Sequence, residues 1–182
     1  MRPEIISPSN FEPIFSNKFF IDTNVWLYLI FPNHSNINKK ITGQYSNLYA
    51  NILSKKCLIE TSIIQISEIV NLILQLEFKE FKKKNSFYGD FKQFRNSENS
   101  KLALQNAQIL VNTITKTSTI RSGNLTPEEI LNISNNIEKA DFNDLCFAKH
   151  CSKENAILVT HDFDFNALDS KFKIVSANEK YL

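Results

Sequence analysis

The 182-residue sequence is poor in glycine, methionine and cysteine, with 3, 1 and 3 residues of each, but has 15 phenylalanines. So few glycines predict few glycine-dependent loops, and the many aromatic residues predict a tightly packed core. Cys57, Cys146 and Cys151 are odd in number, form no C-x-x-C pair and have no paired histidine spacing beside them. We therefore expect neither a disulfide framework nor a zinc site, which is typical of a protein in a reducing cytoplasm.

Long apolar runs are also missing. No segment approaches the roughly 18 uninterrupted apolar residues of a membrane span, and the first residues contain no apolar core of a signal peptide. We therefore expect a cytoplasmic protein without membrane contact. The net charge is only +2, from 21 basic and 19 acidic residues. This balance excludes a uniformly basic nucleic-acid coat, so any contact with nucleic acid must be local.

One local candidate is "EFKEFKKKNSFYGDFKQFR" (residues 77–95), where cations alternate with aromatic residues. Such a segment can bind phosphates and stack bases. Its alternative interpretation is the end of an amphipathic helix with a solvated loop. The substrate-binding candidates in this segment are Lys82, Lys83, Lys84 and Arg95.

Apolar periodicity and helix-end signals predict short strands that alternate with helices. We expect strands at 18–22, 57–62, 156–160 and 172–177, and helices at 23–31 (closed by Pro32), 36–55, 62–81 (capped by Ser62), 101–120, 126–137 (capped by Thr126) and 140–155. Residues 1–17, which contain three prolines, are expected to form an irregular N-terminal arm, followed by a single domain over 18–182. The alternation predicts an α/β fold, a three-layer α/β/α sandwich around a mainly parallel sheet.

Acidic residues stand where such a sheet binds ligands. Asp22 interrupts the apolar run "FFIDTNVWLYLIF" at the end of the first strand, and Asp162 follows the strand "AILVT". Because the ligand crevice of an open parallel sheet lies at the carboxyl ends of its strands, both carboxylates are expected at the same rim. Glu68 has Ile64 and Leu72 as its i−4 and i+4 neighbours, so it projects from an apolar stripe.

Two further acids, Asp141 and Asp144, stand near a helix start, and Asp144 shares a face with Ala148 and Cys151 that is predicted to pack inward. Carboxylates gathered without matching lysines or arginines repel each other, and some would have to protonate. A hard divalent cation such as Mg²⁺ or Mn²⁺ removes this repulsion, because it prefers oxygen ligands.

Each acid also has a structural alternative. Asp22 and Asp141 could cap the helices that follow them, with Asp144 in a first helical turn, and Asp162 and Asp164 could belong to an ordinary turn. An inward-facing Glu68 without a cation is harder to explain in this way. The joint pattern favours a cation site.

Four motifs of the sequence resemble those of the PIN-domain family, which includes the VapC toxins of toxin–antitoxin pairs. They are "FIDTNVWLYL", "TSIIQISEIVN", "DFNDLCFAKHCSKENAILVT" and "VTHDFDF", in the order and spacing of the family. The resemblance implies a PIN-like nuclease domain over 18–182 with the acidic quartet Asp22, Glu68, Asp144 and Asp162 as catalytic and metal ligands, accessory acids Asp141 and Asp164, and supporting polar residues Thr23, Asn24 and Thr160. His161 is either a substrate contact or a surface side chain.

The same resemblance implies hydrolysis of RNA phosphodiester bonds with Mg²⁺ or Mn²⁺, an antitoxin that covers the acidic groove, and a homodimer. The chain is longer than a minimal toxin of this family, with an expected helical or loop insertion around 80–123. Three alternatives stay open: a non-catalytic module that binds RNA or protein, an RNA-processing nuclease without an antitoxin, and a phosphatase with an aspartyl nucleophile. The last usually needs a second acid two residues after the first, where this sequence has Asn24.

Overall fold

The computed structural model describes residues 3–31, 38–121, 125–168 and 171–181. Within these residues the strands are β1 (Glu4–Ile6), β2 (Lys18–Ile21), β3 (Leu58–Ser62), β4 (Thr119–Arg121), β5 (Ile157–Val159) and β6 (Lys173–Val175). The α-helices are α1 (Thr23–Ile30), α2 (Lys39–Ser54), α3 (Ile63–Asn85), α4 (Phe91–Arg95), α5 (Lys101–Thr117), α6 (Pro127–Ser134) and α7 (Phe142–Glu154). Short 3₁₀ turns lie at η1 (Pro8–Asn10), η2 (Glu98–Ser100), η3 (Asp164–Ala167) and η4 (Glu179–Tyr181).

The described strands form one sheet in the order β1-β6-β5-β2-β3-β4, and every pairing is parallel. Connections from β2 proceed outward to β3 and β4, whereas β5 and β6 lie on the other side of β2. The direction of strand order therefore reverses between β2 and β5. In a parallel sheet this switch point opens a crevice at the carboxyl ends of the two strands.

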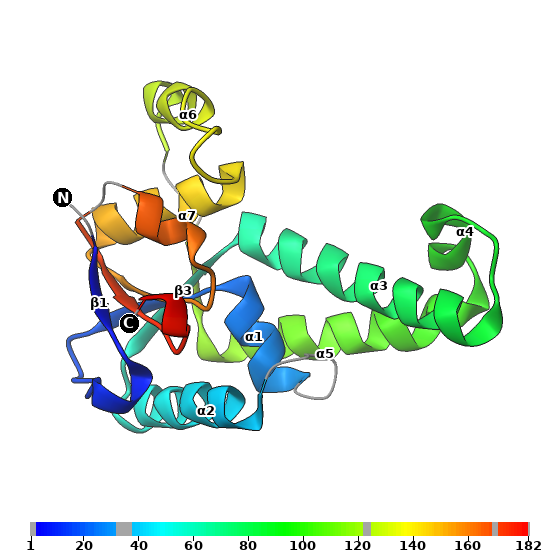
Figure 1. The fold of residues 1–182 in the computed structure, drawn as a ribbon, viewed down its shortest axis with the longest axis horizontal. Coiled ribbons are helices and arrows are strands. Elements are labelled where there is room, and N and C mark those ends of the chain that lie inside the picture. Colours follow the sequence, from blue (N-terminus) through cyan, green and yellow to red (C-terminus); the bar gives the residue numbers. More distant parts are fainter. Residues whose placement is uncertain (1–2, 32–37, 122–124, 169–170, 182) are drawn as a thin grey trace.

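Alternate side chains of the strands supply two cores, one on each face of the sheet. Phe19 and Ile21 of β2 pack with residues of α1, α2, α3 and α5, whereas Phe20 packs with residues of α6 and α7. Figure 1 shows these helices on opposite sides of the strands. The predicted three-layer α/β/α sandwich is thus confirmed.

Helix-end signals account for several boundaries. The Ser62 hydroxyl accepts a hydrogen bond from Gln65 N at the start of α3, as predicted. Thr126 and Glu129 form a reciprocal capping box at the start of α6, with Pro127 in the first turn. These helices therefore begin where the sequence predicts.

Two expectations are wrong. Residues 1–17 are not irregular throughout, because Glu4–Ile6 form β1, which pairs with β6 at Ile5 and Ile174. The helix expected over 101–120 ends at Thr117, and residues 119–121 form β4 beside β3. Both strands are three residues long and obtain their main-chain partners from distant segments, which local periodicity does not reveal. Pro32 and residues 122–123 of the expected insertion lie outside the described residues.

Helices α3 and α5 run side by side as a long hairpin with α4 at its far end (Figure 1). The end of this hairpin has its own apolar cluster, built from Leu74, Phe94 and Ala103 with surrounding phenylalanines. None of the helices formed by the described residues is both long and apolar enough to cross a membrane.

Candidate metal centre at the carboxyl ends of the strands

Asp22 lies at the switch point of the sheet, directly after β2. Its backbone N donates to Val159 O of the neighbouring β5 at 2.9 Å, so the end of each strand is fixed against the other. Its side chain is 4% exposed and serves as the N-cap of α1, with Oδ1 accepting from Thr23 N at 2.7 Å. The capping role and the strand-end role of Asp22 are therefore compatible.

The second oxygen of Asp22 accepts two side-chain hydrogen bonds. Asn24 Nδ2 donates to Oδ2 at 2.7 Å, and Thr160 Oγ1 donates to the same atom at 2.6 Å. Burial nevertheless raises the pKa of Asp22 from 3.8 to about 7, and the charges of Glu68 and Asp162 contribute to this rise. Three hydrogen bonds thus fix the orientation of the Asp22 carboxylate, although burial of its charge costs free energy.

Thr160 connects Asp22 to Asp162. While its hydroxyl donates to Asp22, the same oxygen accepts from Asp162 N at 2.9 Å. Asp162 Oδ1 accepts from Asp164 N at 3.0 Å, and Tyr181 Oη donates to Asp162 O. Asp162 is thus both part of a turn and a half-buried acid at the same rim as Asp22.

Helices α7 and α3 contribute the other two acids. Asp144 lies in the first turn of α7, and its pKa rises to about 8 because of burial and the charges of Asp22, Asp162, Glu68 and Asp141. Burial also raises the pKa of Glu68, whose Oε2 accepts from Asn143 Nδ2 at 3.1 Å. The hydrogen bond between Asn143 and Glu68 ties the two helices together beside the acids.

Positive charge does not neutralise this cluster. Among the ion pairs that the described residues form, none includes Asp22, Glu68, Asp144 or Asp162. Burial is the main cause of the raised pKa values of Asp22 and Asp144, and neighbouring carboxylate charges add to it. An added cation would therefore stabilise the cluster.

The donors fit a hard divalent cation by their chemistry. Every acid offers oxygen, and the buried Thr23 hydroxyl close to them has no hydrogen-bond partner in the described part of the chain. Within that part, no three acidic, histidine or cysteine side chains are close enough to enclose an ion by themselves. Mg²⁺ and Mn²⁺ keep waters and substrate oxygens among their ligands, so protein side chains need not supply a complete coordination shell.

The accessory acids lie further out. Asp141 occupies the N-cap position of α7, but its side chain is exposed and makes no capping hydrogen bond. Asp164 is exposed at the start of η3. Both remain predicted accessory residues.

His161 is not a surface side chain, contrary to one of the two expectations. It is half-buried, its Nδ1 lies 3.0 Å from Tyr45 Oη, and its ring contacts Tyr28 and Tyr45 edge-on at centroid distances of 5.7 and 5.8 Å. Burial lowers the pKa of His161. The residue forms part of the support beneath the loop that carries Asp162.

Tyr45 of α2 is the centre of that support. Its buried hydroxyl donates to Thr160 O at 2.9 Å and accepts from Ala177 N at 2.9 Å, which joins the ends of β5 and β6. This assignment places the His161 ring proton on Nδ1, because Tyr45 has one proton to donate. Sequence alone does not reveal this role, because the partners of the Tyr45 hydroxyl lie more than 100 residues away along the chain.

We expect Tyr45→Phe to lower the free energy of unfolding by about 1–3 kcal/mol, because it leaves the Ala177 N–H and Thr160 carbonyl without their partner. Urea denaturation measures this change. Tyr49→Phe is the matched control on the same helix, since the Tyr49 ring packs edge-on against Trp26 and its hydroxyl forms no hydrogen bond with the part of the chain that the structure describes. Equal losses in the two variants would contradict the role of the Tyr45 hydroxyl.

The basic candidates lie elsewhere. Lys82, Lys83, Lys84 and Arg95 are exposed near the far end of the α3–α5 hairpin, and Lys83 is about 20 Å along α3 from Glu68. The neighbouring phenylalanines pack against one another and are largely occupied by that cluster, whereas Tyr88 is 95% exposed. Contact of these cations with a substrate stays a prediction.

Comparison with known proteins agrees with this α/β fold. The sequence model of the PIN domain family matches residues 19–171, and the chain therefore belongs to the PIN domain family. Members of this family are generally nucleases. A comparison with curated protein sequences gives no significant match.

A similar solved structure supports the fold. One chain in the crystal structure of VapBC2 from Rickettsia felis bound to a DNA fragment from their promoter is 20% identical, with a TM-score of 0.55, over 88% of this chain and 99% of that one. PAE2754 from Pyrobaculum aerophilum is 15% identical, with a TM-score of 0.48, over 91% and 88% of the two chains.

Proposed function

We propose that this protein is a divalent-metal-dependent ribonuclease and the toxin of a toxin–antitoxin pair. The observation that carries the proposal is the electrostatic interaction of Asp22 with Glu68 and Asp162, and of Asp144 with all three, beside the carboxyl ends of β2 and β5. Membership of the PIN family and the fold shared with a VapBC2 chain support it. A cytoplasmic location and an antitoxin that covers the acidic crevice are parts of the same proposal.

In this proposal Asp22, Asp144 and Asp162, with help from Glu68, hold Mg²⁺ or Mn²⁺. The bound cation supplies neutralisation of the phosphate charge and a more acidic water. Asn24 and Thr160 hold Asp22 in its orientation, and Asn143 holds Glu68. Glu68 and Asp144, which both have raised pKa values, are the candidates that accept the proton of the attacking water.

Protein partners are expected to bury apolar surface. Leu102 and Ile109 of α5 are 62% and 56% exposed, which gives an antitoxin or a second copy of the chain an apolar surface to cover. Homodimer formation stays part of the proposal, and the oligomeric state in solution tests it.

The proposal is tested by incubating the purified chain with end-labelled single-stranded and structured RNAs in Mg²⁺, Mn²⁺ or EDTA. We expect cleavage with either metal and none in EDTA. Binding of RNA without cleavage under any metal condition would contradict the enzyme and favour a non-catalytic module.

A further inference from the structure

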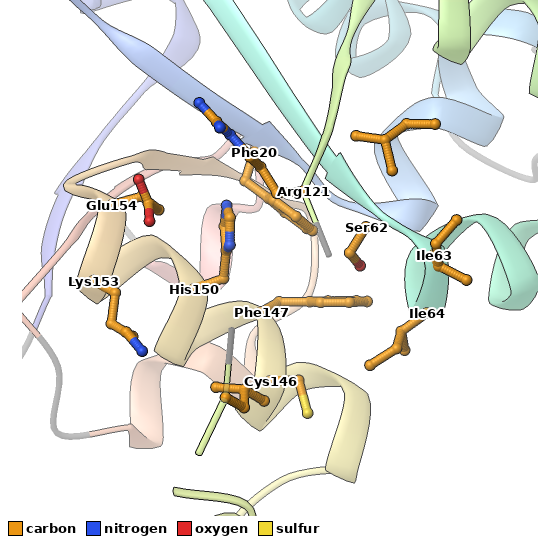
Figure 2. Close-up of a pocket in the computed structure, with 12 residues that line it drawn as sticks. Phe20, Ser62, Ile63, Ile64, Arg121, Cys146, Phe147, His150, Lys153 and Glu154 are labelled. Carbon is orange, nitrogen blue, oxygen red and sulfur yellow. The ribbon is translucent and has the colours of Figure 1, made fainter. Parts of the chain in front are cut away.

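A second cavity lies on the α7 side of the sheet, between α7 and β4 (Figure 2). It has a volume of about 330 Å³, and we call it the α7–β4 pocket. Apolar walls come from Phe20, Phe147, Ile63 and Ile64, and polar groups come from Arg121 and His150. The pocket thus combines an aromatic and aliphatic lining with a small number of donors, as small-molecule sites do.

A buried carboxylate fixes the polar groups of this pocket. Glu60 of β3 is fully buried, its Oε1 accepts from Arg121 Nε at 3.1 Å, and its Oε2 lies 2.9 Å from His150 Nε2. Both oxygens are therefore engaged, and β3, β4 and α7 are joined at one point. The Arg121 side chain is still 48% exposed, so its guanidinium can also face a ligand.

The aromatic wall is equally ordered. The Phe20 ring lies 5.0 Å from the Phe147 ring and 5.2 Å from the His150 ring, measured between centroids. In Figure 2 the Phe147 ring extends from α7 toward Ser62, Ile63 and Ile64. These side chains keep their places because they are packed in the core, so the pocket is formed before a ligand binds.

The α7–β4 pocket adjoins a groove that contains Glu68, one of the four acids. Ile63 and Ile64 line it, and the same two residues line an open groove that also contains Glu68 and Asn143. Ile63 and Ile64 are 61% and 40% exposed at the start of α3. A linear polymer bound at the acidic residues can therefore extend across these two isoleucines into the pocket.

We propose that the α7–β4 pocket binds an unstacked nucleobase of the RNA substrate, next to the phosphate at the acidic crevice. This inference rests on the proposed ribonuclease function. A nucleobase has apolar faces and an edge of acceptors and donors, which matches aromatic and aliphatic walls beside fixed Arg121 and His150. The neighbouring groove with Glu68, beside a crevice suited to a metal and a phosphate, favours a nucleotide over a peptide side chain.

Base preference tests the pocket. We expect the native protein, given a library of randomised single-stranded RNA, to prefer one or two bases by about tenfold at one position beside the cleaved bond, because apolar and hydrogen-bond contacts discriminate by about that factor. Ile120→Trp places a larger ring from β4 at the pocket. It is expected to abolish most of this preference and to raise KM, while kcat changes by less than about threefold.

Ile14→Trp is the matched control, since Ile14 is an exposed isoleucine of the N-terminal segment and is not part of the pocket lining. It should cleave with the native preference. Cleavage without base preference by the native protein, or full preference in Ile120→Trp, would overturn the proposal and leave the ribonuclease function intact.

A binding measurement in EDTA separates the two proposals. With isoleucine methyl groups labelled, the four nucleoside 5′-monophosphates are titrated into the native protein, and the NMR signals of Ile63, Ile64 and Ile120 are followed. Saturable shifts support the base pocket even if no RNA is cleaved. If no nucleotide shifts these signals, the proposed base pocket is overturned. It is also overturned if the signals respond only to a co-expressed protein partner.

Discussion

Asp22→Asn is expected to reduce metal-dependent RNA cleavage by at least about 10³-fold. A metal ion contributes several kcal/mol of transition-state stabilisation, and each 1.36 kcal/mol corresponds to a factor of ten in rate. Asp22 interacts electrostatically with Glu68, Asp162 and Asp144, so loss of its charge should weaken the proposed cation site. Single-turnover cleavage of one RNA measures the effect.

The same variant should remain folded, because asparagine has the size of aspartate, keeps an oxygen that can accept from Thr23 N, and places an amide in the position of Oδ2 that can donate to Thr160 Oγ1. Asp164→Asn is the matched control, since Asp164 is exposed and its backbone, not its side chain, contacts Asp162. We expect it to lose less than about tenfold. Equal cleavage by Asp22→Asn and the native protein would remove Asp22 from the site.

The metal-free protein is expected to lose stability as pH rises. The folded-state pKa values of Asp22 and Asp144, about 7 and about 8, exceed the ordinary value of 3.8. Between pH 4 and pH 8 the folded state therefore binds more protons than the unfolded state, and the free energy of unfolding falls with increasing pH. The decrease is on the order of a few kcal/mol, which corresponds to about 5–10 °C in Tm for a chain of this size.

Thermal unfolding in EDTA from pH 5 to pH 8.5 measures this dependence. Saturating Mg²⁺ or Mn²⁺ at pH 8 should restore the stability, because a cation that binds only the folded state stabilises it. Asp22→Asn, which has no such charge, should be more stable than the native protein in EDTA at pH 8 and should respond less to metal. A native Tm that rises with pH in EDTA would contradict the crowding of charges at the crevice.

The part of the site that could be predicted from the sequence lies mainly at the carboxyl ends of two strands. The short apolar runs that end at Ile21 and Val159 were recognised locally, and parallel pairing then fixed their carboxyl ends side by side. This is why the convergence of Asp22 and Asp162 could be predicted across a large separation in sequence. Glu68 and Asp144 followed from helical periodicity, which specifies a face of a helix but not its exact neighbour.

Contacts between distant segments could not be predicted. The Asn143–Glu68 hydrogen bond and the Tyr45 hydroxyl network depend on how helices dock on the sheet. Glu60 belongs to the predicted strand "CLIETS", and the sequence alone does not show that this position is fully buried. A fully buried acid requires partners, which here are Arg121 and His150. Burial of that position became evident only from the packing of β3 between β2 and β4.

Direct titration with Mn²⁺, followed by electron paramagnetic resonance at pH 8, tests most simply whether the acidic crevice is a divalent cation site. The account predicts saturable binding to the native protein, at least tenfold weaker binding to Asp22→Asn, and native-like binding to Asp164→Asn. Equal Mn²⁺ binding by the native protein and Asp22→Asn would contradict it.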